Sequence, residues 1–480
     1  MYHLLIRIAC ILGLFLPLFN YADINPEGLN LNYAQKAFSS IGNPASAALV
    51  IQRDDPNTVK GGYISIGAGV EFGDLDEIFN KINEFSDKIP PPSNPDAPQE
   101  PPEIENPDRN YTWEDILAKY PDLDDRLDII KDRVVTSAAL LALISAEGYA
   151  KAAANSHASF ILNEDLYGGT LLLGATFKGN AKALGIAEAL NFDAEFAKEQ
   201  LKTLPSYDES DPIQDIDLSS GIVLHYDPSH QNTSLSMSND SILLVKSTKI
   251  ASFSFSYSHI VSSFELGDLY WGVEPNFYRV GLTNVTARLG DITDSEELFN
   301  DIKDADYIYK NNFDFDFGLV FAAQNYQLGV TFNNVIEQTY SFPEIDRRRY
   351  NSNFVLKKLD QHAKFTMERQ ATIEAGIYSD DRAWNLHLEV DANAISDQME
   401  DKSQWLSITG NYASERYWLP DLRLGFSKNL AGSNLSYVNA GFTLIKFLSL
   451  DVSSTLDTVR LDDQNIRRGL HVQLGVQFPY

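Results

Sequence analysis

The chain has 480 residues, 44% of them hydrophobic, and its mean hydropathy of −0.22 is that of a globular chain, not of a helical membrane protein. After residue 20, no apolar run approaches the roughly 20 residues that a membrane-spanning helix requires, which excludes helical multi-span proteins. Asp and Glu outnumber Lys and Arg by 67 to 38, and the formal charge of −29 opposes attraction to nucleic-acid phosphates, so we expect no nucleic-acid partner.

Residues 1–22 have the features of an export signal. Arg7 precedes an apolar stretch that extends from Ile8 to Phe19, and the small residue Ala22 follows it. We expect cleavage after residue 22, with an uncleaved anchor as the alternative. Cys10 is the only cysteine of the sequence, so the exported chain would have no thiol, no disulfide and no thiolate metal site.

The next segments differ strongly in composition. Residues 23–61 are rich in Asn, Ala and Ser, and residues 62–73 (GYISIGAGVEFG) predict a first strand. Residues 74–160 read as an exposed insertion that contains a short amphipathic helix at 74–88 and the acidic linker IPPPSNPDAPQEPPEIENPD, which can form polyproline segments but no packed core. From residue 123 to about 154, apolar residues recur every three or four positions, which predicts a long helix or a broken pair.

Residues 161–480 show a period of two. Phe313, Phe315 and Phe317 alternate with Asp314 and Asp316, and the link AAQN to the next alternating run predicts a hairpin. The same alternation is found from 251 to 258, from 384 to 393 and from 470 to 480. Together with the strand at 62–73 the sequence predicts about 14 strands, many of about ten residues, which is the length of tilted strands that cross a bilayer.

Two environments could explain strands with one apolar face. In a soluble sandwich, strands average about five or six residues and the apolar faces share one core. In a transmembrane barrel, the apolar face contacts lipid and aromatic residues gather at the interfaces. The chain has 27 Phe and 23 Tyr, and its last strand ends on Phe478 and Tyr480, an aromatic terminus of the kind that barrel proteins present to the barrel assembly machinery. We therefore predict an all-β transmembrane barrel in the outer membrane of a Gram-negative bacterium, with outer-membrane lipid around it. Aromatic residues near strand ends that fit the interfaces are Tyr257, Phe332, Tyr412, Trp418, Phe426 and Tyr480.

Several stretches resemble the conjugal-transfer TraF-like family of predicted outer-membrane proteins. They are WLPDLRLGFSKNLAGSNLSYVNAGFTLIKFLSLDVSSTL, RRGLHVQLGV, ILLVKSTKIASFSFSYSH and the N-terminal GNPASAA. That family is similar to a distant branch of the FadL-type barrels, which have fourteen strands, an N-terminal plug inside the lumen, and a role in passing hydrophobic compounds across the outer membrane. The resemblance implies that residues 23–61 are plug-like and that Asn43, Pro44 and Ala45 belong to the plug; a tight turn before a strand is the alternative. The thioredoxin-like F-plasmid protein of the same name is a different case, because this chain has no Cys-x-x-Cys.

The sequence contains no recognisable active site, so we expect no enzyme activity and no cofactor. The eight histidines are scattered without metal spacing, and no nucleophile elbow or phosphate loop is found. Carboxylates two residues apart share one face of a strand and could bind a cation or bias a pore towards cations. Ordinary lumen charge, balanced by arginines such as Arg279, is the alternative. The expected lumen-facing residues are Asp314, Asp316, Glu389, Asp391 and Arg423.

Three functions are compatible with the sequence. The first is passive passage of a hydrophobic small molecule through a plugged lumen. The second is a structural or assembly protein of a transfer or secretion apparatus, in which the acidic insertion at 74–160 recruits a conjugation or secretion component. The third, a soluble periplasmic β-protein, would leave the membrane without detergent.

Overall fold

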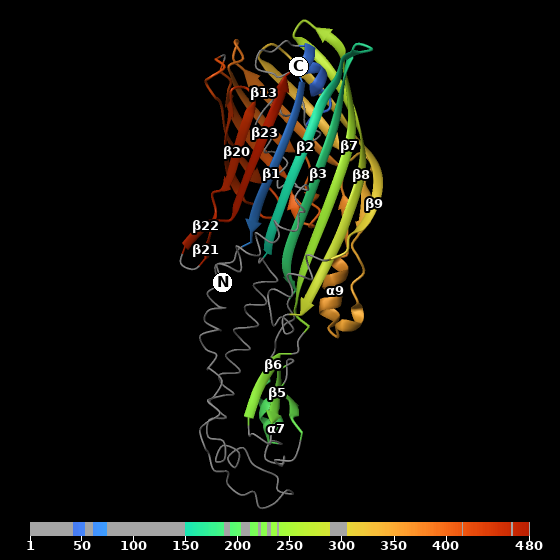
Figure 1. The fold of residues 1–480 in the computed structure, drawn as a ribbon, viewed down its shortest axis with the longest axis vertical. Helices are drawn as coiled ribbons and strands as arrows, with labels where there is room; N and C mark the ends of the chain where they lie inside the picture. Colours follow the sequence, from blue (N-terminus) through green and yellow to red (C-terminus); the bar gives the residue numbers. More distant parts are fainter. Residues whose placement is uncertain are drawn as a thin grey trace, which may run out of the picture.

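Fourteen strands form one closed antiparallel barrel (Figure 1). The computed structural model describes residues 42–52, 61–73, 149–186, 193–202, 212–218, 222–227, 232–237, 240–288, 305–414, 416–461 and 464–479. The last strand, β23 (Gly469–Pro479), pairs with the first, β1 (Gly61–Phe72), so the sheet has no free edge. The remaining strands, in order around the wall, are β2 (Tyr149–Leu166), β3 (Gly169–Ile186), β7 (Ile242–Phe264), β8 (Gly267–Arg288), β9 (Ile308–Ala322), β10 (Tyr326–Asn333), β13 (Gln370–Tyr378), β14 (Trp384–Asp391), β17 (Trp405–Tyr412), β18 (Asp421–Asn429), β19 (Ser436–Leu444) and β20 (Leu448–Thr455). The predicted all-β barrel of about 14 antiparallel strands is confirmed.

The apolar side chains of the wall point outward and the polar ones point inward. On β7, Phe253 and Phe255 are exposed, whereas Ser254 and Ser256 are buried. The same alternation is found on β17, β18, β19 and β23. A soluble sheet would bury its apolar face, so this reversed arrangement is that of a barrel whose outer face contacts lipid.

The two ends of the barrel differ in their connections. Residues Gly61 and Pro479 lie at the short-turn end, where strands are joined by residues 167–168, 265–266, 323–325, 379–383, 413–420 and 445–447. At the opposite, long-connection end, strands are joined by residues 73–148, 187–241, 289–307, 334–369, 392–404, 430–435 and 456–468.

The strands β7 and β8 are much longer than a bilayer requires. They have 23 and 22 residues, against the roughly 9–11 that a tilted strand needs to cross the hydrocarbon region. In Figure 1 they extend past the other strands toward α9 (Asn353–Gln361) at the long-connection end. This part of the wall therefore extends beyond the membrane.

The connections carry small elements of their own. Between β3 and β7 lie α7 (Ala194–Leu201) and the sheet β4–β5–β6 (Gln214–Asp217, Ile222–Asp227, Asn232–Met237). Between β10 and β13 lie the pair β11–β12 (Gln338–Ser341, Lys364–Met367), η2 (Arg347–Arg349) and α9, whose first turn is capped by Ser352. The short pairs β15–β16 (Ile395–Ser396, Lys402–Ser403) and β21–β22 (Thr458–Leu461, Gln464–Arg467) form hairpins. Within the described residues, no helix is long and apolar enough to cross a membrane.

The structure changes one expected boundary. The insertion was expected to extend to residue 160 and its long helix to about 154, but β2 begins at Tyr149 and pairs with both β1 and β3. The Ala-rich stretch 150–154 favours a helix by intrinsic propensity, and barrel pairing overrides that preference. The expected signal segment, most of the 23–61 segment and the Pro-rich linker lie outside the described residues.

Candidate functional site

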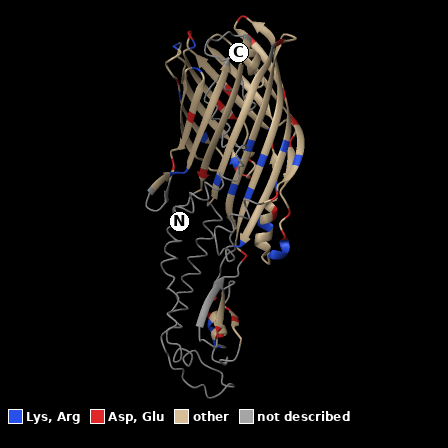
Figure 2. Ribbon diagram, viewed as in Figure 1, with Lys and Arg blue, Asp and Glu red and all other residues tan. Residues whose placement is uncertain are grey.

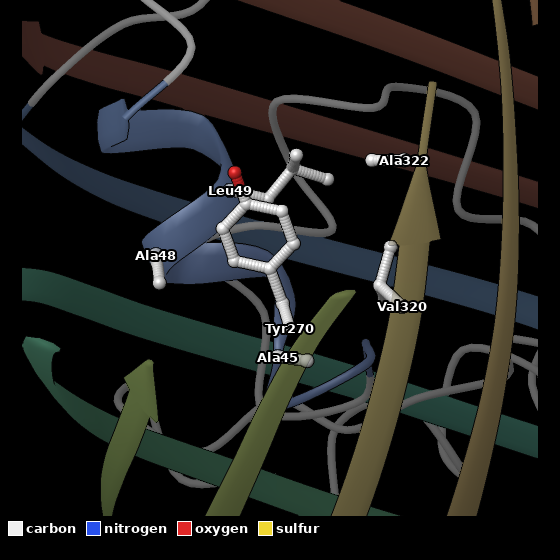
Figure 3. Close-up of a cluster of buried hydrophobic side chains, with 6 residues drawn as sticks. All are labelled: Ala45, Ala48, Leu49, Tyr270, Val320 and Ala322. Carbon is white, nitrogen blue, oxygen red and sulfur yellow. The ribbon is translucent and has the colours of Figure 1, made fainter. Parts of the chain in front are cut away.

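A short helix lies inside the barrel near the short-turn end. This helix, α3 (Ser46–Gln52), directly follows Asn43, Pro44 and Ala45, and all three of these residues are buried. Figure 3 shows Ala48 and Leu49 of α3 against Tyr270 of β8 and the inner face of β9. On its other side, α3 packs against β1, β2 and β3 through a second apolar cluster, which consists of Ala47, Val50, Tyr63, Ile161 and Leu172.

The side chain of Asn43 fixes this segment to the wall. Its Nδ2 donates to the carbonyl oxygens of Leu319 (3.1 Å) and Val330 (3.2 Å) and to Oε1 of Glu374 (3.1 Å). Its Oδ1 accepts from the backbone N–H of Ala45 at 3.0 Å, which closes a turn before the helix. Because Asn43 is buried, loss of these bonds would leave polar groups unsatisfied.

The wall also bonds to the backbone of the segment. The N–H of Ala48 donates to Oγ of Ser258 at 2.8 Å, and Oγ of Ser256 donates to the carbonyl of Pro44 at 3.4 Å. Both serines lie on the inward face of β7. The polar positions of this strand therefore hold the first turn of α3.

Two glycines make room for the turn. A Cβ on Gly272 would lie 2.3 Å from the carbonyl carbon of Pro44, and a Cβ on Gly318 would lie 2.0 Å from Oδ1 of Asn43. The two glycines are direct partners in the β8–β9 register. Any side chain at either position would occupy the place of the Asn43–Pro44 backbone or amide.

Three inward-facing lysines form a row near the long-connection end. In the strand register, Lys151 of β2 is opposite Lys182 of β3, and Lys182 is opposite Lys246 of β7. Figure 2 shows basic residues on these strands in the half of the barrel nearer the long connections. Like charges directly opposite each other in a sheet are destabilising, so this row requires nearby negative charge.

The β15–β16 hairpin supplies that charge. Asp397 pairs with Lys151, Asp401 pairs with Lys182, and Oε1 of Glu400 lies 3.1 Å from Nζ of Lys246. These three ion pairs connect one side of the barrel to the hairpin that joins β14 and β17. We call residues 395–403 the latch.

Hydrogen bonds close the turn of the latch, and the latch has further contacts. Oδ1 of Asp397 accepts from the N–H groups of Met399 (2.8 Å) and Asp401 (2.9 Å). Nδ1 of His362, which follows α9, lies 2.6 Å from Oε2 of Glu400. Met399 is almost fully buried in this arrangement. The latch therefore connects β2, β3 and β7 to the segment after α9.

The carboxyl of Asp401 lies outside the barrel strands. Burial raises the pKa of the Asp401 carboxyl, but the ammonium groups of Lys151 and Lys182 lower it by more, so that the pKa lies below its ordinary value of 3.8. The carboxylate is therefore charged at neutral pH and remains available to both lysines.

An apolar cluster lies at the same end of the lumen. The β11–β12 pair packs Tyr340, Phe342 and Phe365 against inward-facing residues of β7 and β8, and the rings of Tyr340 and Phe365 stack with centroids 5.1 Å apart. Nζ of Lys246 lies 4.1 Å from the centroid of Phe342, so the cluster directly adjoins the lysine row. We call this the mouth cluster, and it also includes Ile250, Val280, Leu282, Tyr278 and Met367.

The predicted pair Asp314 and Asp316 lies on the inward face of β9, where both residues are buried. Oδ1 of Asp314 accepts from the N–H of Ile336 at 2.8 Å, and Oδ1 of Asp316 accepts from the N–H of Asn334 at 2.8 Å. Oδ2 of Asp316 also accepts from Asn276 at 2.7 Å. In this structure the pair holds the chain that follows β10.

The other predicted lumen residues have separate surroundings. Asp391 accepts from the N–H of Trp405 at 2.7 Å, and Arg423 donates to Asp451 at 2.8 Å. Glu389 lies with Glu374 and His387 in a group whose ligand atoms are within 4.8 Å of one another. The five predicted residues are thus distributed over several places on the inner wall.

Arg279 and Phe478 both lie on the outer face of the barrel wall. The alternative to cation binding was lumen charge balanced by arginines such as Arg279, and for Arg279 this is wrong, because it is exposed on the outward face of β8 and stacks over the ring of Tyr309. Phe478 is on the outward face of β23 and packs edge-on against Phe447, whereas Tyr480 lies outside the described residues. The lysine row and the latch were not predicted. The only sequence signal for them is the clustering of three acidic residues in DQMED (397–401).

Known proteins resemble the chain at two levels. Residues 40–391 match the family described as "F plasmid transfer operon, TraF, protein", and no curated protein matches the sequence. Among solved structures, it is similar to a TodX deltaS2S3 mutant, a monoaromatic hydrocarbon channel, with 10% identity and a TM-score of 0.36 over 91% of this chain and 92% of that one. It is also similar to the Ralstonia pickettii toluene transporter TbuX, with 10% identity and a TM-score of 0.38 over 95% and 100%.

Proposed function

The chain belongs to the family described as the F plasmid transfer operon TraF protein, and from that premise and the geometry of the lumen we propose that it passes a hydrophobic small molecule across the outer membrane. Outer-membrane barrels have short periplasmic turns and longer extracellular loops. The latch and the mouth cluster would then face the outside, and α3 would face the periplasm.

The observation that carries the proposal is the presence of a separate chain segment inside each end of the lumen. The segment 42–52 packs against the wall at the short-turn end, and the latch crosses from the β14–β17 connection to the lysines on the opposite wall. Each segment is held by a small number of hydrogen bonds or ion pairs, together with apolar packing. Such contacts can break and re-form, which suits a gated passage better than an open water-filled pore.

The apolar residues near both segments support a hydrophobic ligand. A ligand would first collect on the mouth cluster around Tyr340, Phe342 and Phe365, which pack against inward-facing residues of β7 and β8. After the latch opens, the ligand would move down the lumen to the surface that α3 shares with Tyr270 and Val320. Displacement of α3 would release it at the other end.

The test is uptake by living cells. Their lipopolysaccharide slows the entry of hydrophobic compounds, whereas the membrane of an isolated lipid vesicle presents no such barrier. Cells of a Gram-negative host that make the protein should accumulate radiolabelled toluene or oleate faster than cells with an empty vector. Phe342→Ser should reduce this uptake, whereas the matched change Leu388→Ser, on the outer face of β14, should not. Equal uptake by cells with and without the folded barrel would contradict the proposal.

The second candidate is an assembly role, favoured by the family description and by the acidic Pro-rich insertion. Because β1 ends at Phe72 and β2 begins at Tyr149, the insertion leaves from the long-connection end. Deletion of residues 75–147 should abolish assembly of a transfer apparatus and spare uptake if this role is correct. Transfer that survives the deletion would rule it out.

A further inference from the structure

Three potential metal ligands meet on the inner wall. Glu374 lies on β13, and His387 and Glu389 lie two residues apart on the inward face of β14. One ligand atom from each lies within 4.8 Å of the other two. Among the described residues, this is the only group of three His, Cys, Asp or Glu side chains placed to hold a metal ion. Glu374 and Glu389 are direct cross-strand partners, so two carboxylates face each other in the register. Like charges in that position are destabilising. A cation bound between the two carboxylates would attract both of them and offset their repulsion.

The imidazole of His387 is placed as a ligand. Its Nε2 lies 3.5 Å from Oε2 of Glu374, and within the described chain this buried nitrogen has no hydrogen-bond partner. A separation of 3.5 Å is long for a hydrogen bond. It is close to the roughly 3.4 Å expected between two ligand atoms on a tetrahedral ion with bonds of about 2.1 Å.

We propose that Glu374, His387 and Glu389 bind one zinc-class divalent cation on the lumen wall. An imidazole with two carboxylates suits zinc, whereas calcium and magnesium prefer sites made of oxygen alone. Three protein ligands leave one coordination position for water. The site lies in the lumen and is independent of the proposed passage of a hydrophobic molecule.

The cation would also stabilise the position of α3. Oε1 of Glu374 accepts from Nδ2 of Asn43, while Oε2 faces His387, so one carboxylate joins the helix segment to the site. Hydrogen bonds from a second residue orient a ligating carboxylate, and their loss reduces metal affinity about 10–100-fold. Because coupling between two sites is reciprocal, the cation should in turn hold Asn43 against the wall.

The experiment uses the full-length protein, purified in detergent, stripped with EDTA and titrated calorimetrically with Zn2+. We expect about one ion per chain. His387→Gln and Glu389→Gln should each weaken binding by at least about ten-fold, and Asn43→Ala should do so by about ten-fold as an indirect effect. The control is His471→Gln, a buried histidine on β23, which should bind as the wild type does. Mobility of unheated samples in electrophoresis verifies that each variant forms the closed barrel.

A second readout covers variants that fail to fold. Wild-type protein loaded with Co2+ should show the visible absorption bands of a tetrahedral site, and Zn2+ should displace them. The proposal is overturned if wild-type protein takes up no saturable Zn2+, if His387→Gln and Glu389→Gln bind as tightly as the wild type, or if Ca2+ and Mg2+ compete equally. None of these outcomes depends on transport, so a failure here leaves the proposed function untouched.

Discussion

Gly272 and Gly318 are paired across β8 and β9, and the space above both is filled by the Asn43–Pro44 turn. The relationship predicts the effect of a methyl group. Gly318→Ala would place Cβ 2.0 Å from Oδ1 of Asn43, and overpacking of this kind costs about 1–3 kcal/mol. Such a cost corresponds to a roughly 5–150-fold shift towards a displaced helix.

The shift should be measurable as increased single-channel conductance in planar bilayers. The matched control is Gly410→Ala, whose added carbon would lie 3.9 Å from its nearest neighbour, and which should conduct as the wild type does. Both variants should still form the closed barrel in electrophoresis. Unchanged conductance of a folded Gly318→Ala variant would argue against α3 as an obstruction.

Two substitutions of Asn43 distinguish the role of its amide donor from that of its amide oxygen. Asn43→Ala loses the bonds to Leu319, Val330 and Glu374, and unsatisfied buried groups cost about 1–3 kcal/mol. Asn43→Asp keeps the acceptor for Ala45 but turns a carboxylate toward two carbonyl oxygens and a carboxylate. We therefore expect conductance at neutral pH to increase in the order wild type, Asn43→Ala, Asn43→Asp. The reverse order of the two variants would mean that the amide is not the anchor.

The latch depends on a buried cation. Lys246 is fully buried and faces Glu400, so Glu400→Gln removes the charge that compensates it, a change that costs about 3–5 kcal/mol in buried pairs. We expect the latch to open. A thiol reagent should then label Met399→Cys, which is nearly inaccessible in the closed latch, whereas Leu266→Cys at the opposite end should react at the same rate in both backgrounds.

Removal of both charges should restore the closed state. In the double variant Glu400→Gln and Lys246→Met no uncompensated ammonium remains, and apolar replacement of a buried pair is often neutral. Labelling of Met399→Cys should therefore fall back towards that of the wild type. If the two substitutions are simply additive, Lys246 and Glu400 do not interact in the latch.

The latch should weaken only in strong acid. Because the folded pKa of Asp401 lies below 3.8, its contribution is fully present above about pH 4 and is lost as the pH falls through that lower value. Conductance should be constant between pH 7 and pH 5 and should increase below pH 4. Asp401→Asn should conduct more at neutral pH and should show a smaller acid response. An increase of conductance near pH 6 would mean that a group other than Asp401 controls the opening of the latch.

The outer face should reject charge. Leu424, on β18, is 68% exposed on the face that contacts lipid, and arginine near the middle of the bilayer costs about 2–4 kcal/mol in a barrel. Leu424→Arg should lower the free energy of unfolding in lipid vesicles by that amount, measured by denaturant titration with electrophoretic detection. Leu456→Arg, in the β20–β23 connection, is the control and should change it by less than about 1 kcal/mol.

Much of this architecture follows from local patterns. The alternation of Phe253 and Phe255 with Ser254 and Ser256 assigns each residue to a face, because successive side chains of a strand point to opposite sides. The apolar face of these strands, which have about ten residues, favours contact with lipid over burial in a core shared by two sheets. The start of β2 at Tyr149 was missed because the alanine-rich stretch that follows has no strong period of two. Its pairing with Gly69 and Val70 of β1 is not a local property of the sequence.

The candidate site depends on distances that no local pattern contains. The lysine row exists because the register brings Lys151, Lys182 and Lys246 side by side, and the latch reaches them from residues more than 150 positions further along the sequence. The sequence alone determined most of the strands, the two faces of most of them and the solvent that each face meets. Only closure of the barrel decided which charges meet across the lumen and which glycines receive the Asn43 turn, because register and closure are set by the pairing of all fourteen strands together.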